Sequence, residues 1–191
     1  MSQLDPKILS DLKRQHLLRD GHYALHSGHH SSGLLDRDRL LSDPVAASHM
    51  GYAIAKHFFT AHVETVAVPS IWGAGLAQWV AYFLEPKAYV VSATPTNGSV
   101  SIARNLEDLI RERRVLAIDN LIISGETMRH FTKLVAGLGG EVLGIGTLWS
   151  SVEDEIGGHE IFGLLNAEYE AYAPGQCPLC SAGGSPEAAS Y

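Results

Sequence analysis

The side chains best suited to chemistry lie in one short stretch: Asp119, Asn120, Ser124, Gly125, Glu126 and Thr127. The first two follow an apolar, β-prone run, so they stand where a buried strand would end. The serine and the glycine can turn the chain and cap a helix that begins near Glu126. Acids at a strand tip can hold sugar hydroxyls, and backbone N–H groups at a helix start can hold an anion. The spacing therefore suits a ribose phosphate, although an ordinary strand–loop–helix connection has the same local pattern.

The rest of the chain predicts the elements that would position this stretch. Asp-Pro caps and apolar periodicity predict helices at 5–19, 43–60, 76–84 and 126–138. Apolar, β-prone runs predict strands at 63–68, 88–92, 115–118, 142–148, 160–165 and 168–173. A strand, a glycine-containing loop, a helix and another strand in succession form a βαβ unit. The predicted fold class is therefore α/β with a parallel sheet.

Composition narrows the class of protein. A chain of 191 residues with 46% hydrophobic residues fits one soluble globular domain. The net charge of -7 argues against a general nucleic-acid surface, and no apolar run reaches membrane-spanning length. The first residues show no basic region followed by an apolar run, so no signal peptide is predicted. Two cysteines do not make a disulfide framework, and we expect a cytoplasmic protein.

The order of these pieces resembles the type I phosphoribosyltransferases, and most closely the orotate phosphoribosyltransferases. The resemblance spans about residues 19–184 and rests on five segments. Residues 21–31 resemble the family's hood segment, which ends in Ser-Gly-x-x-Ser, and Cys-Pro-Leu-Cys at 177–180 matches a tail signature of many bacterial members. The remaining three correspond to the pyrophosphate loop, the flexible catalytic loop and the phosphoribosyl pyrophosphate motif: 69–75, 93–105 and 119–127.

The resemblance implies an architecture and a chemistry. It implies one domain over residues 1–191, with a central mostly parallel sheet flanked by helices. A small hood subdomain would comprise residues 19–36 and 155–175, and an irregular tail would follow at 174–191. In the family's reaction a nucleobase nitrogen attacks the anomeric carbon of phosphoribosyl pyrophosphate as pyrophosphate leaves, with Mg²⁺ on the diphosphate and ribose. The implied partners are phosphoribosyl pyrophosphate or a nucleotide, and a second copy in a homodimer.

The resemblance also assigns residues to parts of the site. The phosphoribosyl group would be held by the six residues named first, Asp119 to Thr127. The pyrophosphate loop would contribute Ser70, Ile71, Trp72 and Gly73, and the hood would contribute Ser27, Gly28 and Ser31 near the base.

Several of these positions depart from the family pattern. Asn120 replaces the second of two adjacent acids, and Ile123 removes a hydroxyl from the phosphate loop. Glu126 brings a carboxylate to the positive end of a helix, where it either repels a phosphate or simply faces solvent. Trp72 replaces a glycine that would let the backbone approach a ligand. Its indole must fill that space, swing aside or pack against the following helix.

Cations are missing where the family uses them. Residues 92–103 contain no Lys or Arg, and Arg104, at the far end of the flexible loop, is the first candidate catalytic cation. Losing one electrostatic stabiliser typically costs roughly 10²–10³ in rate. Ser150 and Ser151 stand where the orotate enzymes carry Asp-Arg, whose arginine holds the orotate carboxylate.

Histidines and cysteines raise the question of a metal. His22, His26, His29 and His30 lie in a turn-rich segment whose alternation predicts short, half-exposed strands joined by a polar turn. No acid or cysteine nearby in sequence completes a ligand set, so we favour plain strands there. Cys177 and Cys180 are half of a structural zinc site, which a dimer partner or His159 would complete. Two free thiols are the favoured interpretation, and redox chemistry is disfavoured because no helix start follows.

Two functions fit these observations. The first is a phosphoribosyltransferase, using Mg²⁺, that is weak or inactive on orotate and diverged in its base. The second is a non-catalytic module that binds a nucleotide or another phosphoribosyl ligand, with Trp72 as a stacking surface. A cation such as Arg104, or one from a partner chain, would preserve activity.

Overall fold

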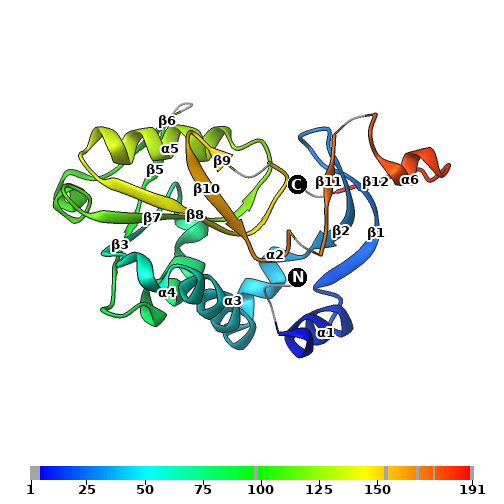
Figure 1. Ribbon diagram of the computed structural model, residues 1–191, viewed down its shortest axis with the longest axis horizontal. Coiled ribbons are helices and arrows are strands. Elements are labelled where there is room, and N and C mark those ends of the chain that lie inside the picture. Colours follow the sequence, from blue (N-terminus) through cyan, green and yellow to red (C-terminus); the bar gives the residue numbers. More distant parts are fainter. Residues whose placement is uncertain (1–4, 97–98, 153–154, 167, 174, 190–191) are drawn as a thin grey trace.

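The computed structural model describes residues 5–96, 99–152, 155–166, 168–173 and 175–189. Its larger part is a six-stranded sheet in the order β4-β3-β7-β8-β10-β9, with helices on both faces (Figure 1). The strands are β3 (Thr65–Val68), β4 (Tyr89–Ser92), β7 (Arg114–Ile122), β8 (Glu141–Ser150), β9 (Glu155–Ile156) and β10 (His159–Gly163). Only β9 and β10 pair antiparallel in this sheet. The predicted α/β class with a mostly parallel sheet is confirmed.

Strand β7 lies in the middle of the sheet and is buried on both faces. Leu116 and Ile118 belong to a core shared with α3 (Pro44–His57) and α4 (Ala74–Phe83). Val115 and Ala117 belong to a second core, with α5 (Glu126–Gly137). Burial on both faces explains why this strand is a continuous apolar run rather than an alternating one. It also holds the end of β7 rigidly beside the start of α5.

The hood is a separate four-stranded sheet in the order β11-β2-β1-β12. Its strands are β1 (Leu18–Ala24), β2 (His30–Leu35), β11 (Ala171–Tyr172) and β12 (Glu187–Ala188). The predicted pair of short strands joined by a polar turn is therefore present. Residues 155–163 were expected in the hood but form β9 and β10 of the main sheet, because Ile161 and Phe162 pair with β8 there. Residue 167 of the predicted hood lies outside the described residues.

The tail is more ordered than predicted. It contains α6 (Pro178–Ser181), for which Cys177 is the N-cap residue, and it ends in strand β12. This helix begins inside the Cys-x-x-Cys motif, and among the described residues after Cys180 no further helix starts. Pro at the first helical position is the sequence signal that would have indicated this helix. Residues 174, 190 and 191 of the predicted tail lie outside the described residues.

Other boundaries differ by a few residues. Helix α1 (Pro6–Arg14) begins after the predicted Asp5 cap but ends early, and α2 (Arg37–Ser42) was not predicted. The predicted loop at 93–105 forms a small hairpin, in which residues 97 and 98 lie outside the described residues. The hairpin strands are β5 (Thr94–Thr96) and β6 (Ser99–Ser101). The described residues also form the short 3₁₀ helices η1 (Phe59–Ala61), η2 (Ile71–Gly73) and η3 (Arg104–Leu109).

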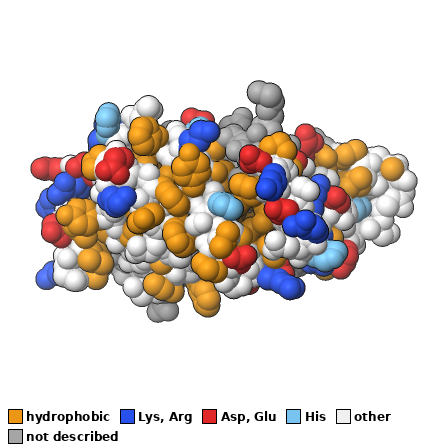
Figure 2. Space-filling model, turned by 90° about the horizontal axis from the view of Figure 1, so that it is seen from below, with side chains coloured by type: hydrophobic (Ala, Val, Ile, Leu, Met, Phe, Trp, Pro, Cys, Tyr) orange, Lys and Arg blue, Asp and Glu red, His pale blue; other side chains and the backbone are white. Residues whose placement is uncertain are grey.

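In the part of the chain that the structure describes, no helix has the length and apolarity needed to cross a membrane. Hydrophobic side chains gather on the face that carries α3 and α4, seen from below in Figure 2. Exposed apolar side chains on these two helices are Val45, Tyr52 and Tyr82.

Candidate functional site

A cleft of about 860 Å³ opens beside strand β7 of the main sheet. It is lined from five places in the sequence: the start of α2, the loop before α4, the β5–β6 hairpin, β7 and the start of α5. The lining residues used below are Arg37, Asp38, Ser70, Trp72, Thr96, Ser99, Asp119, Ser124, Glu126, Thr127 and His130. The cleft thus brings together residues from three segments singled out in the sequence, 69–75, 93–105 and 119–127.

Asp119 lies inside β7, three residues before the strand ends at Ile122. The strand continues past it, against the prediction, because Leu121 and Ile122 are buried and pair with β8. Burial raises the pKa of the Asp119 carboxyl to about 6, against an opposing contribution from the Asn120 backbone N–H, which donates to Oδ1 at 2.8 Å. The nearby Arg37 also favours the charged form. Above this pKa the carboxylate is an acceptor for a sugar hydroxyl.

Asn120 does not line the cleft. Its side-chain Nδ2 donates to the backbone oxygen of Trp72 at 2.8 Å, and only 5% of the residue is exposed. Successive residues of a strand point to opposite faces, so Asp119 and Asn120 cannot both point to the ligand. The structure therefore does not place Asn120 as a sugar ligand: its amide ties the pyrophosphate loop to β7. An aspartate at this position lacks the N–H that makes this bond.

The loop into α5 has the geometry of an anion site. Gly125 has a φ of +72°, and a Cβ added to it would lie 2.9 Å from Cδ1 of Ile156, so glycine is required here. The Ser124 hydroxyl accepts from the Glu126 backbone N–H at 3.4 Å, as predicted for a turn that begins a helix. Thr127, the second residue of α5, also lines the cleft and brings a hydroxyl to it. Unpaired N–H groups of the first turn of α5 face an anion site of this kind.

Glu126 is exposed and also lines the cleft. Its solvent exposure agrees with the first of the two alternatives, and its place in the cleft agrees with the second, interference with a bound phosphate. A carboxylate in the first turn stabilises α5 but lowers the positive potential that would attract a phosphate.

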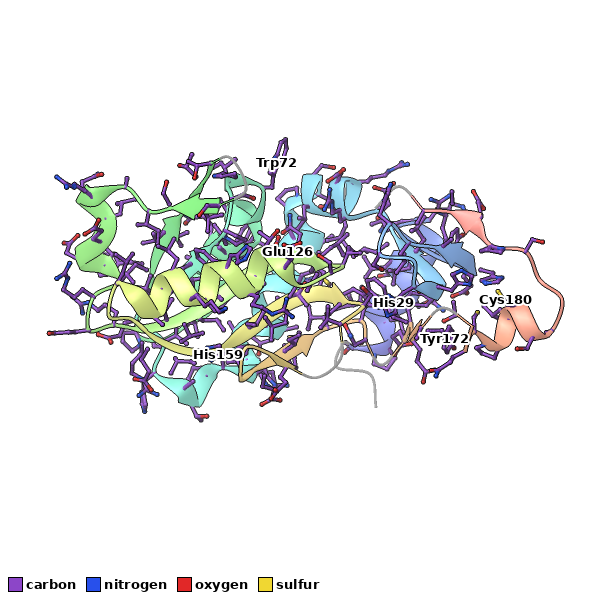
Figure 3. All side chains as sticks on the ribbon, turned by 90° about the horizontal axis from the view of Figure 1, so that it is seen from above. His29, Trp72, Glu126, His159, Tyr172 and Cys180 are labelled. Carbon is purple, nitrogen blue, oxygen red and sulfur yellow. The ribbon has the colours of Figure 1, made fainter. Side chains whose placement is uncertain are left out.

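Trp72 has swung aside rather than packing on α4. Its side chain is 81% exposed and projects from the molecule on the side where α5 begins (Figure 3). Gly73, which follows, is buried, and an added Cβ would lie 3.0 Å from Cγ1 of Val68. Ser70 lines the cleft with Trp72, whereas the exposed Ile71 is not among the residues that line it. An exposed indole at the mouth of a cleft is a ready stacking surface for a base.

The β5–β6 hairpin contributes Thr96 and Ser99 but no charge to the cleft. Arg104, the predicted cation, is exposed in η3 and is not among the described residues that line the cleft. Sequence reasoning missed two basic groups that do line it, Arg37 and His130. The predicted helix at 126–138 could have indicated His130 by its position one turn into α5. Nothing in the sequence indicated Arg37 as a residue of the cleft, because helix α2 was not predicted.

The remaining predicted positions lie elsewhere. Ser31 is fully buried, and its hydroxyl accepts from the Gly33 backbone N–H at 3.1 Å. Neither Ser31 nor Ser27 or Gly28 is among the described residues that line the cleft. Ser150 and Ser151 are buried, and the Ser151 hydroxyl donates to the Ile123 backbone oxygen at 2.6 Å.

The fold and cleft together define an α/β protein with a polar cleft beside a mostly parallel sheet, and comparison with known proteins gives the family. Orotate phosphoribosyltransferase of Thermus thermophilus is 31% identical over 181 residues, which are 92% of this chain and 96% of that protein. The enzyme of Thermotoga maritima is 30% identical, over 90% of this chain and 91% of its own. The chain therefore belongs to the type I phosphoribosyltransferase family and is similar within it to orotate phosphoribosyltransferases, which confirms the resemblance.

Solved structures agree on the fold. Orotate phosphoribosyltransferase from Aeropyrum pernix matches with a TM-score of 0.61 at 17% identity, over 82% of this chain and 92% of that one. Adenine phosphoribosyltransferase from Thermoanaerobacter pseudethanolicus matches with a TM-score of 0.57 at 21% identity, over 69% and 87%. No family model matches the chain.

Proposed function

We propose that the cleft binds a 5-phosphoribosyl compound, either phosphoribosyl pyrophosphate or a nucleotide. We further propose that the protein transfers phosphoribosyl groups to a nucleobase, with weak or no activity on orotate. The observation that carries this proposal is that Asp119 and the start of α5, with Ser124 and Thr127, line one cleft. A hydroxyl acceptor and an anion site side by side match a ribose and its phosphate.

In this proposal each residue has a distinct task. The backbone N–H groups at the start of α5 and the Thr127 hydroxyl donate to the 5-phosphate. Asp119 accepts a hydrogen bond from a ribose hydroxyl. Arg37, the first residue of α2, brings a positive charge to the same cleft. Trp72 offers its face to a base. A solved phosphoribosyltransferase of Mycobacterium tuberculosis with a TM-score of 0.51 is described in complex with phosphoribosyl pyrophosphate, which supports this choice of ligand.

The donor set also fits Mg²⁺, which favours oxygen ligands and is usually held by one or two carboxylates together with substrate phosphates. Asp38, Asp119 and Glu126 are the carboxylates among the described residues that line the cleft, and they would hold the ion or its water shell. When bound, the ion would neutralise charge on a leaving diphosphate. The protein's own contribution would be to orient the ribose and to position the phosphate.

Three features support weak catalysis. The β5–β6 hairpin reaches the cleft without a Lys or Arg, although a leaving diphosphate needs positive charge in the transition state. Arg37 is partly engaged, since its Nε donates to Asp38 at 3.2 Å. Glu126 adds a negative charge to the phosphate end. Each missing stabiliser typically costs roughly 10²–10³ in rate.

Orotate is disfavoured for a separate reason. Its carboxylate requires a cation, and the two serines at the expected place are buried and hydrogen-bonded within the chain, Ser150 to Val152 and Ser151 to Ile123. A base without a carboxylate needs no such partner.

The alternative is a non-catalytic binding module on the same fold. The exposed Trp72 and the uncharged hairpin favour it, since both suit binding more than charge stabilisation. We also propose a cytoplasmic location. A homodimer would form through the exposed apolar side chains of Val45, Tyr52 and Tyr82. Sedimentation equilibrium of the purified chain tests the dimer: a monomer at micromolar concentration contradicts it.

The deciding experiment incubates the purified protein with phosphoribosyl pyrophosphate, Mg²⁺ and a panel of nucleobases, and measures pyrophosphate release. We expect slow or absent release with orotate. Rapid release with orotate contradicts the proposal, rapid release with another base selects the transferase over the binding module, and release with none selects the module. The Asp119→Asn variant is the control for release that does not come from this cleft.

A further inference from the structure

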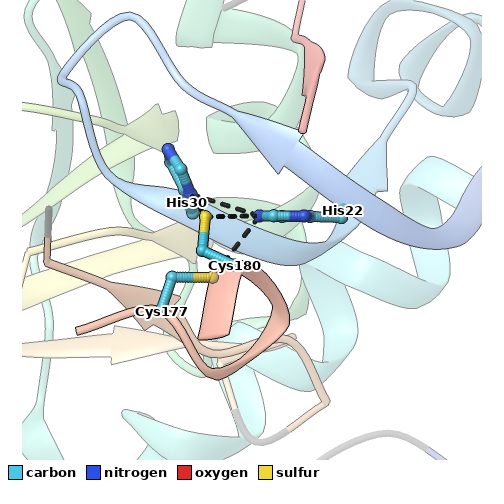
Figure 4. A group of neighbouring side chains, drawn as sticks. All are labelled: His22, His30, Cys177 and Cys180. Atoms are coloured by element: carbon cyan, nitrogen blue, oxygen red, sulfur yellow. Dashed lines mark hydrogen bonds between the residues drawn. The ribbon is translucent and has the colours of Figure 1, made fainter. Parts of the chain in front are cut away.

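Four side chains that bind transition metals meet in the hood, away from the cleft (Figure 4). His22 comes from β1, His30 from β2, and Cys177 and Cys180 flank the first turn of α6. One ligand atom from each residue lies within 4.8 Å of the other three. Both cysteines are free thiols. None of the four lines the phosphoribosyl cleft, so this site is independent of the proposed function.

The fold explains why residues so distant in sequence meet. β1 and β2 are antiparallel, and His30 lies opposite Ala24. The register is irregular between Asp20 and Tyr23, where His22 lies, and there Nε2 of His22 comes within 3.1 Å of Nδ1 of His30. The tail pairs with β2 through β11 and with β1 through β12. Between these two strands it must cross the hood, and α6 lies on this crossing with both thiols directed at the histidines.

Four of the six ligand–ligand distances match the edges of a tetrahedral metal site, and all six are 4.8 Å or less. Nε2 of His22 lies 3.1 Å from Nδ1 of His30 and 3.4 Å from Sγ of Cys177, and Sγ of Cys180 lies 3.3 Å from Nδ1 of His30. A tetrahedron with zinc–sulfur bonds of about 2.3 Å and zinc–nitrogen bonds of about 2.0–2.1 Å has nitrogen–nitrogen edges of roughly 3.3 Å and nitrogen–sulfur edges of roughly 3.6 Å. The observed contacts lie within a few tenths of an ångström of these edges.

Hydrogen bonds alone do not account for the cluster. Nε2 of His22 is in contact with His30, with Cys177 and with Cys180, the last at 3.6 Å. An imidazole nitrogen carries either one hydrogen or one lone pair, so it makes one good hydrogen bond and not three. Thiols are also weak donors. A cation at the centre satisfies all four groups at once.

We propose that His22, His30, Cys177 and Cys180 bind a structural zinc ion. Two thiolates and two neutral imidazoles in a tetrahedron are a common zinc ligand set, and four protein ligands leave no open position for catalysis. The Cys-x-x-Cys spacing with a helix turn between the thiols is that of many such sites.

This inference corrects two expectations from the sequence. The histidine segment does form strands, but its missing ligands come from the tail, about 150 residues further along the chain. His159 lies in β10 and is not part of the cluster; Figure 3 shows it at the other end of the molecule from Cys180. A search for ligands nearby in sequence could not find this set.

The ion would fasten the tail to the hood. β11 and β12 each contain two residues, and strands this short hold a segment weakly by themselves. Coordination bonds from β1 and β2 and from the two cysteines at α6 take the place of the backbone hydrogen bonds that longer strands would make. Removal of the metal is therefore expected to release residues 173–186 while the main sheet stays folded.

The test is the metal content of the full-length protein, purified under reducing conditions, dialysed against Zn²⁺ and then freed of loosely bound ions. We expect about one zinc per chain by elemental analysis, and near-complete loss in Cys180→Ser and in His30→Ala. His26→Ala is the matched control, because His26 is an exposed histidine of the same turn and lies outside the cluster. It should retain the full metal content.

Cobalt substitution provides a second readout that does not depend on the variants. Co²⁺ in this site should give the intense visible bands of a tetrahedral ion and a thiolate charge-transfer band, and Zn²⁺ should displace it. The proposal is overturned if the reduced wild-type protein binds no stoichiometric zinc, if Cys180→Ser and His30→Ala both retain it, or if the cobalt spectrum lacks thiolate bands. If a variant does not fold, the wild-type stoichiometry and spectrum decide alone.

Discussion

Replacing Glu126 by glutamine tests whether its carboxylate limits anion binding at the start of α5. The carboxylate lies in the first helical turn and lines the cleft. A phosphate held by that turn would lie roughly 5 Å away, at a distance typical of neighbouring groups on a helix. Two unit charges at that separation in water repel by about 1 kcal/mol, and the water value applies because Glu126 is exposed.

The expected effect of Glu126→Gln is therefore a gain in affinity of about fivefold for phosphoribosyl pyrophosphate, which corresponds to about 1 kcal/mol. The variant should at the same time lose roughly 0.3–1 kcal/mol of stability, because a first-turn carboxylate favours the helix dipole. Binding should be measured by isothermal titration calorimetry at low salt without added Mg²⁺, since Glu126 is also a possible ligand of that ion. The gain should shrink in high salt, which screens exposed charges.

Glu187→Gln is the matched control, because it removes the same charge from exposed strand β12, outside the cleft. It should leave the affinity unchanged. Equal gains in both variants would show that only the net charge of the protein matters. An unchanged or weaker affinity in Glu126→Gln would refute the reasoning, since the carboxylate would then be remote from the anion or useful to its binding.

Three further variants test other parts of the site. Asn120→Asp removes the 2.8 Å hydrogen bond to the Trp72 backbone oxygen and places a carboxylate beside that oxygen. Urea unfolding at pH 7 should show a loss of about 2 kcal/mol in the free energy of unfolding. An unchanged free energy of unfolding would show that this hydrogen bond does not hold the loop. Burial raises the pKa of Asp119 to about 6 from 3.8, so the folded state binds its proton more tightly than the unfolded state. The wild type should therefore lose up to about 3 kcal/mol relative to Asp119→Asn as the pH rises from 4 to 7, and parallel pH profiles would contradict the shift. Ser99→Arg adds a cation to the cleft and should increase any pyrophosphate release by at least about tenfold. Ser101→Arg is the control, because it lies on the same strand outside the cleft and should not increase release. Equal rates in the two variants would contradict a catalytic deficit in this hairpin.

Most of the helices and strands could be predicted from the sequence, because the patterns that indicate them are local. The apolar run of β7, the Gly125 turn and the Asp-Pro caps each depend on neighbouring residues alone, and all are present in the structure. The start of α5 near Glu126 follows from those elements, whereas Asp119 was expected at the end of the strand and lies three residues before it. The residues that form these elements could therefore be predicted from the sequence, although the exact strand and helix boundaries could not.

Long-range contacts were not predictable in the same way. The direction of the Asn120 side chain is decided by the backbone of the pyrophosphate loop, 48 residues earlier in the chain. Arg37 enters the cleft through a short helix with a weak periodic signal. The four hood ligands meet only because the tail crosses the hood sheet between β11 and β12.

The central claim is that this cleft binds a 5-phosphoribosyl group through Asp119 and the start of α5. Calorimetric titration of the purified protein with phosphoribosyl pyrophosphate tests it most directly, with Asp119→Asn titrated alongside. The account predicts saturable binding in the millimolar range or tighter, about one ligand per chain, weakened several-fold in the variant. Absence of binding at millimolar ligand, or equal binding by the wild type and the variant, would contradict it.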